Sequence, residues 1–142
     1  MIKINFIFDK TKSSLNFKKL ILKMKYKSYD SVISQCHKII KRLDKINDVI
    51  YKPHILSMLG LSYMHLKQYK KSEKCFLDHL ELYKKMKSVS HQALSFKQLG
   101  ELYYRTKDYD KSLLFFHKSY EIHNRLKSIQ HDYEIIKYIS LI

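Results

Sequence analysis

Histidine and cysteine are common ligands of metal ions in proteins, and this sequence contains both. The 142 residues contain eight histidines and only two cysteines, Cys36 and Cys75. Metal sites are built from ligands at short spacings such as C-x-x-C or H-x-x-x-H. Neither cysteine has a companion of that kind. We therefore expect no metal site and no cofactor.

The motifs that accompany catalysis are also missing from the sequence. It has no phosphate-binding G-x-x-x-x-G-K-[ST], no G-x-G-x-x-G, no H-E-x-x-H and no G-x-S-x-G. Gly60 and Gly100 are its only glycines, so it cannot form a glycine-rich loop around a phosphate. We expect that the chain is not an enzyme.

Both glycines lie in a repeated phrase. Residues 59–72 read LGLSYMHLKQYKKS, and residues 99–112 read LGELYYRTKDYDKS. A shift of 40 residues aligns 59–91 with 99–131, with 12 identities in 33 positions. A fixed period of this size indicates stacked supersecondary units.

Each unit has the apolar spacing of two helices. Phe96, Leu99 and Tyr103 recur at i, i+3 and i+7, and a second helical pattern begins at Tyr109. With two glycines and one proline there are few places for hairpins of strands, so an all-α fold is favoured. Asp108 is expected to cap the second helix of its unit, and Ser28 is expected to do so at the equivalent position two periods upstream.

The glycines are placed inside the first helix of each unit, where glycine is less favourable than alanine by about 1 kcal/mol. Gly60 and Gly100 occupy equivalent positions, so a neighbouring helix is expected to pass too close there for a Cβ atom. The small side chains Ser72 and Ser112 are expected on the other side of that contact.

The order of these residues resembles the tetratricopeptide repeat. Leu59-Gly60, Tyr63, Ser72 and Phe76 match its pattern, as do the residues 40 positions later. The resemblance implies an all-α, right-handed superhelix of stacked antiparallel helical hairpins, with about seven helices. The period exceeds the usual 34 residues and is similar to that of the Leu-Gly-Asn-type signalling modulators and rapsyn.

We expect a single domain over residues 13–142, after an N-terminal extension of residues 1–12. A degenerate unit would span about 13–48, full units about 51–88 and 91–128, and a lone final helix about 129–142. The apolar end EIIKYISLI is unusual for a terminal helix, which is normally polar outside. It predicts self-association, or coverage by further repeats of a larger scaffold of which this chain is a fragment.

The resemblance implies a non-catalytic adaptor that binds a peptide or helix of a partner protein in a concave groove lined by the first helices. Leu61 and Glu101 stand where chaperone-binding members have asparagine, so a chaperone C-terminus is not the expected ligand. The middle unit, Met-rich and apolar, would contribute His54, Ser57, Met58, Leu61, Met64 and His65, and the last full unit Leu94, Lys97, Gln98, Glu101, Tyr104 and Arg105.

The remaining aromatic and sulfur residues divide between core and surface. Cys36 falls at the repeat position of Phe76, and Cys75 one position earlier, so the two thiols are expected to point in different directions. Tyr104, Tyr133 and Tyr138 fall outside the repeated framework and are better candidates for binding. The framework tyrosines, expected to be buried with the hydroxyl at an edge, are Tyr63, Tyr69, Tyr103 and Tyr109.

The formal net charge of +15 allows a second interpretation, a basic helical repeat that binds nucleic acid non-specifically. Of the 28 basic residues 25 are lysine, which gives phosphate affinity but poor base readout. The lysines expected to face phosphates are Lys3, Lys10, Lys12, Lys18, Lys19, Lys23, Lys25 and Lys27.

The sequence has no apolar run long enough to cross a membrane, and we expect a cytoplasmic protein. Residues 15–27 are basic and amphipathic, which leaves a mitochondrial presequence as an alternative, although they lack arginine.

Overall fold

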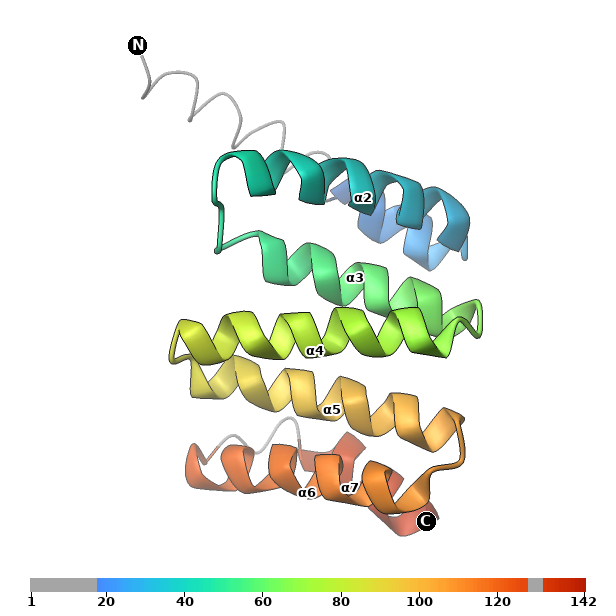
Figure 1. Cartoon of the computed structure of the whole chain (residues 1–142). Helices are drawn as coiled ribbons and strands as arrows, with labels where there is room; N and C mark the ends of the chain where they lie inside the picture. The colour runs from blue at the N-terminus through green and yellow to red at the C-terminus, as the bar shows by residue number, and fades with distance from the viewer. Residues whose placement is uncertain (1–17, 128–131) are drawn as a thin grey trace.

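The computed structural model describes residues 18–127 and 132–142, and within these ranges it contains helices and no strand. Residues 1–12, the expected N-terminal extension, lie outside the described part. The helices stack side by side in chain order, and α7 ends the stack opposite to residues 18–25 (Figure 1). The predicted all-α solenoid is confirmed. Its helices are residues 18–25, α2 (Tyr29–Lys45), α3 (Lys52–His65), α4 (Tyr69–Lys85), α5 (Val89–Arg105), α6 (Tyr109–Arg125) and α7 (Asp132–Leu141).

The core runs through the stack as two clusters of buried apolar side chains. The first joins Leu20 and Val32 to Leu59 of α3. The second joins α3 through Met64 to Phe76 of α4 and Leu99 of α5. Because α3 contributes to both clusters, it is covered on both sides, and nine of its 14 residues are buried.

Every described turn between helices contains one residue with positive φ. These residues end the preceding helix in the left-handed conformation that usually selects glycine. At Lys67 the N–H donates to the Met64 carbonyl at 3.1 Å, and the N–H of Gln68 donates to the Tyr63 carbonyl at 2.9 Å. The spacing is a constant 20 residues, half of the period found in the sequence. The positions are Lys27, Asn47, Lys67, Lys87, Lys107 and Lys127, with φ between 50° and 64°.

The helix caps follow the sequence prediction only in part. A carboxylate oxygen of Asp108 accepts from the backbone N–H of Lys111 at 3.3 Å, which confirms the predicted cap of α6. Ser28 makes no such bond at the start of α2, so the predicted serine cap is wrong.

The predicted close approach at the two glycines is confirmed, but its partner is a different residue. A Cβ atom on Gly60 would overlap the ring of Phe76, and one on Gly100 would overlap the ring of Phe116. Ser72 instead contributes a hydrogen bond, in which its Oγ donates to the Gly60 carbonyl at 2.8 Å. The second unit repeats the arrangement, because Oγ of Ser112 donates to the Gly100 carbonyl at 2.8 Å. In each unit a phenylalanine ring and a serine hydroxyl of the second helix thus contact the glycine of the first helix.

The framework tyrosines lie at different depths. Tyr63 is buried and its Oη is 2.7 Å from Nε2 of His37. Tyr103 is half-buried and donates to a carboxylate oxygen of Glu73, and Tyr69 is also half-buried. Tyr109 is 44% exposed, so the prediction that it is buried is wrong.

Candidate functional site

The twelve residues predicted to bind a partner all lie on α3 and α5, the first helices of the two complete hairpins. Nine of them have side chains that are at least partly accessible. We call this set the first-helix surface. Its exposed members are His54, His65, Leu94 and Arg105, and its half-buried members are Ser57, Leu61, Lys97, Glu101 and Tyr104.

Met58, Met64 and Gln98 are buried, which corrects the expected methionine-rich surface. Met58 is 7% exposed and packs in the first core cluster. Met64 is 2% exposed and packs in the second. Both thioethers are enclosed because α3 has a neighbouring helix on each side. The accessible apolar side chains of the first-helix surface are therefore Leu61 and Leu94.

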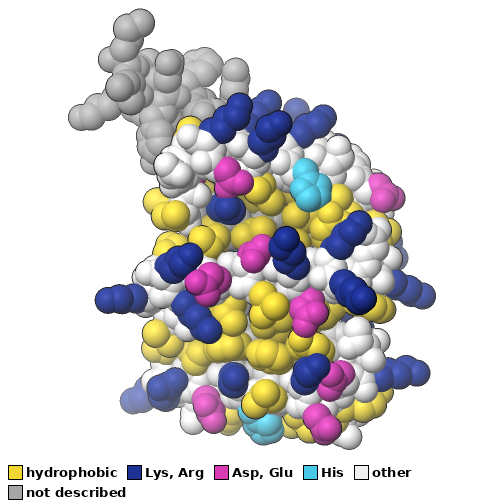
Figure 2. All heavy atoms as spheres, viewed as in Figure 1, with side chains coloured by type: hydrophobic (Ala, Val, Ile, Leu, Met, Phe, Trp, Pro, Cys, Tyr) yellow, Lys and Arg dark blue, Asp and Glu magenta, His cyan; other side chains and the backbone are white. Residues whose placement is uncertain are grey.

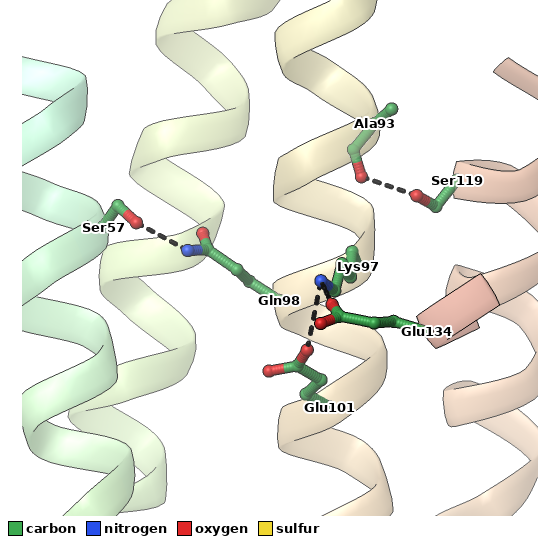
Figure 3. Close-up of polar contacts among 7 residues, drawn as sticks. All are labelled: Ser57, Ala93, Lys97, Gln98, Glu101, Ser119 and Glu134. Carbon is green, nitrogen blue, oxygen red and sulfur yellow. Dashed lines mark hydrogen bonds and ion pairs between the residues drawn. The ribbon is translucent and has the colours of Figure 1, made fainter. Parts of the chain in front are cut away.

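A hydrogen bond between side chains joins α3 to α5. Nε2 of Gln98 donates to Oγ of Ser57 at 2.5 Å, and Figure 3 shows the Gln98 side chain pointing from α5 toward α3. The amide oxygen of Gln98 is buried and has no hydrogen-bond partner among the described residues. The bond fixes the distance between two successive first helices, so Gln98 has a positioning role there.

A second polar contact joins α5 to α7. Nζ of Lys97 pairs with a carboxylate oxygen of Glu134 and lies 3.9 Å from Oε1 of Glu101 (Figure 3). Burial raises the pKa of the Glu101 carboxyl, and the charge of Lys97 opposes that rise. One lysine thus connects two carboxylates from different helices. Lys97 and Glu101 are half-buried members of the first-helix surface, and Glu134 is exposed on α7.

Glu134 was not predicted as a site residue, although the repeat contained the necessary signal. Two shifts of 40 residues place it in register with Leu94 and His54, which were both predicted. It is exposed on α7 and extends the first-helix surface to a third helix. The sequence alignment of residues 131–142 with the earlier first helices was therefore sufficient to find it.

The tyrosines outside the framework do not behave alike. The ring of Tyr104 lies 5.4 Å from that of Tyr138, and Tyr138 stacks on Phe116 with 4.9 Å between ring centroids. Burial raises the pKa of the Tyr138 hydroxyl. Tyr133 is 77% exposed. Tyr104 and Tyr138 attach α7 to the stack. Of the three tyrosines, only Tyr133 has a largely solvent-exposed side chain.

The two cysteines lie in one core cluster with Tyr63. Burial raises the pKa of each thiol to about 12. Both side chains are protonated at neutral pH and pack as small apolar groups. Among the described residues there is no group of three or more histidine, cysteine, aspartate or glutamate side chains that could hold a metal ion.

The lysines considered for nucleic-acid binding lie around the first described helix. Lys3, Lys10 and Lys12 fall outside the described residues. Lys18, Lys19, Lys25 and Lys27 are exposed, and Nζ of Lys23 donates to Oγ of Ser31 at 2.8 Å. Figure 2 shows lysine and arginine side chains distributed over the whole viewed face, with apolar side chains between them.

A comparison of the sequence with models of protein families identifies the family of the repeats. The model of the tetratricopeptide repeat matches residues 52–135, which include α3 to α6 and the start of α7. The chain belongs to the tetratricopeptide repeat family. The comparison with curated proteins finds no match.

The fold of this chain is similar to that of a solved structure. The crystal structure of BtubC (BKLC) from P. vanneervenii superposes with a TM-score of 0.72 at 18% sequence identity. The match covers 80% of this chain and 46% of BtubC, so the chain spans about half the length of that relative.

In the described residues, no helix is both long and apolar enough to cross a membrane. Tetratricopeptide repeats are generally protein-interaction modules, and this chain contains two complete hairpins of that kind, α3–α4 and α5–α6.

Proposed function

We propose that this chain is a non-catalytic adaptor that binds a helix or extended segment of a partner protein across α3, α5 and α7. The observation that carries the proposal is the accessibility of equivalent positions on these successive first helices. His54, Leu94 and Glu134 occupy one such row, and all three are exposed. In this family the first helices line the concave side of the superhelix, so the row would face a bound segment.

The chemistry of the surface favours an amphipathic partner. Leu94 on α5 is 42% exposed and Leu61 on α3 is half-buried, and these two side chains supply apolar contact area. Lys97 and Glu101 are half-buried and charged, so they can fix the register of a polar face through charge-assisted hydrogen bonds. The 40-residue period shared with Leu-Gly-Asn-type modulators supports a protein segment as the ligand.

The test compares two double variants, each of which replaces one exposed leucine and one exposed basic residue by glutamate. Leu94→Glu/Arg105→Glu changes the first-helix surface, and Leu77→Glu/Lys74→Glu makes matched changes on the outside of α4. A partner captured by the wild-type protein is then purified, and its affinity for each variant is measured by calorimetry. We expect a loss of about tenfold or more for the first variant, with circular dichroism unchanged.

Retention of full affinity by a folded Leu94→Glu/Arg105→Glu variant would exclude the first-helix surface as the binding site. Equal loss in both variants would instead indicate a general electrostatic effect. The nucleic-acid alternative is tested separately by the salt dependence of RNA and DNA binding, where a log–log slope near zero excludes it.

A further inference from the structure

Three histidines from successive helices lie at the boundary between the two complete hairpins. His54 is on α3, His79 is on α4 and His91 is on α5. His79 is buried, whereas His54 and His91 are exposed. Nδ1 of His79 and Oγ of Ser95 are 2.7 Å apart and form a hydrogen bond, which connects α4 of one hairpin to α5 of the next. We call these four residues the histidine contact.

The boundary between the hairpins is held differently from the inside of a hairpin. Within each hairpin, the glycine of the first helix packs directly against a phenylalanine ring of the second helix. Across the boundary, α4 and α5 are in less extensive contact than the paired helices of either hairpin. Side-chain hydrogen bonds also cross it, between His79 and Ser95 and between Gln98 and Ser57. The stack can therefore open here while both hairpins stay intact.

A proton on His79 has no favourable partner at this boundary. The titratable groups that face the ring are Tyr83 on its own helix, His54 on α3 and His91 on α5. None of the three is negatively charged below neutral pH, and the two histidines become positive there. Burial, with contributions from His54 and His91, lowers the pKa of His79 from 6.5 to about 4. A protonated His79 ring therefore disfavours the closed arrangement of α4 and α5.

We propose that the histidine contact is an acid-sensitive switch that joins the hairpins α3–α4 and α5–α6. The contact is closed while the His79 ring is neutral. On acidification the ring binds a proton, α4 and α5 separate, and water reaches the ring while the helices of each hairpin stay paired. The first-helix surface spans both hairpins, so opening moves its α3 part away from its α5 part. Release of a bound segment would follow, a consequence that rests on the proposed function.

Pulsed electron spin resonance of the full chain measures the opening without any partner, through spin labels on two introduced cysteines. Lys74→Cys on α4 and Leu114→Cys on α6 use exposed, equivalent positions of the two hairpins. Leu94→Cys with Leu114→Cys is the control pair, because these exposed positions belong to the two helices of one hairpin. The native Cys36 and Cys75 are buried, so the label reacts with the introduced thiols.

Between pH 6.5 and about 4 we expect a second, longer distance for the α4–α6 pair. The ratio of closed to open molecules should fall about 20-fold from neutral pH to about pH 5, because the open state binds the additional proton. The distance of the α5–α6 pair and the helical circular dichroism should stay unchanged. His79→Gln, which binds no proton, should abolish the opening, whereas His117→Gln, exposed on α6, should leave it as in the wild type.

His91→Gln provides a second variant at an exposed position, which keeps the test valid if His79→Gln does not fold. Loss of the His91 charge makes a proton on His79 less unfavourable in the closed state, so opening should require a lower pH. An α4–α6 distance that stays constant down to about pH 4, an equal change in the α5–α6 pair, or unaltered opening in both histidine-contact variants would each overturn the proposal.

Discussion

A Cβ atom on Gly60 would lie 2.5 Å from Cε1 of the Phe76 ring. Phe76 is fully buried, so its ring has no open space into which it can turn. The same relationship joins Gly100 to Phe116 one period later. The glycine in the repeated phrase is therefore required by the packing of the two helices of each hairpin, and not by the conformation of its own backbone.

We predict that Gly60→Ala destabilises the protein, although alanine is the better helix former. Overpacking of this kind costs about 1 to 3 kcal/mol, which exceeds the gain of about 1 kcal/mol in helix propensity. Urea unfolding of Gly60→Ala, Phe76→Leu and the double variant measures the coupling. The double variant should be more stable than the sum of the single changes predicts, since leucine leaves room for the methyl group. Strict additivity would contradict this packing.

The left-handed residue between α3 and α4 allows a stabilising substitution. Lys67 has a φ of 60°, and its side chain is exposed. A non-glycine residue there is strained by about 1 kcal/mol. Lys67→Gly is expected to raise the free energy of unfolding by up to about 1 kcal/mol and the Tm by a few degrees. Lys70→Gly, inside α4, should lower both, and a lowered Tm in Lys67→Gly would refute the prediction.

A buried histidine makes stability dependent on pH. His79 is 1% exposed, and its Nδ1 lies 2.7 Å from Oγ of Ser95 on α5. Burial lowers the pKa of His79 from 6.5 to about 4, and His54 of α3 and His91 of α5 add to that effect. The ring also meets the edge of Tyr83 on its own helix. His79 is therefore neutral in the folded protein at pH values where the unfolded chain is protonated.

We predict that acidification weakens the fold between pH 6.5 and about 4, because the unfolded state binds the additional proton in that window. Above pH 6.5 both states are neutral at this residue and the effect is absent. The full loss is roughly 3 kcal/mol. Unfolding of His79→Gln as a function of pH should show a smaller slope, whereas His117→Gln, at an exposed position on α6, should change it little. An NMR titration of His79 with a pKa near 6.5 would refute the assignment.

Ile135 contributes a buried side chain to the attachment of α7, in addition to the contacts of Tyr138 and Glu134. Ile135 is fully buried, whereas its neighbour Ile136 is 50% exposed. Removing a buried isoleucine side chain costs about 2 to 5 kcal/mol. At low protein concentration, Ile135→Ala should speed hydrogen exchange of the α7 amides and leave α3 to α5 protected, because the terminal helix can open alone. Ile136→Ala is the matched control, and equal exchange in the two variants would contradict this attachment.

The repeat itself could be predicted from the sequence because it depends on local spacing. The two copies of the Leu-Gly phrase, the helical periodicity and the close approach at Gly60 were all visible in the order of residues. The 20-residue spacing of the turns was also present, since lysine or asparagine occupies every left-handed position. It was missed because lysine is common throughout this chain, and it carries no turn signal of the kind that glycine would have given.

The sequence by itself determined an all-α chain of stacked hairpins and the helices that carry the first-helix surface. Only the tertiary structure decided which of those side chains are open. Met58 and Met64 are enclosed because α3 packs against neighbours on both sides, whereas Ile136 of α7 is open because no described helix covers that face. A repeat period assigns equivalent positions, but burial depends on how many neighbours each helix has in the stack, which is a property of the whole assembly of helices.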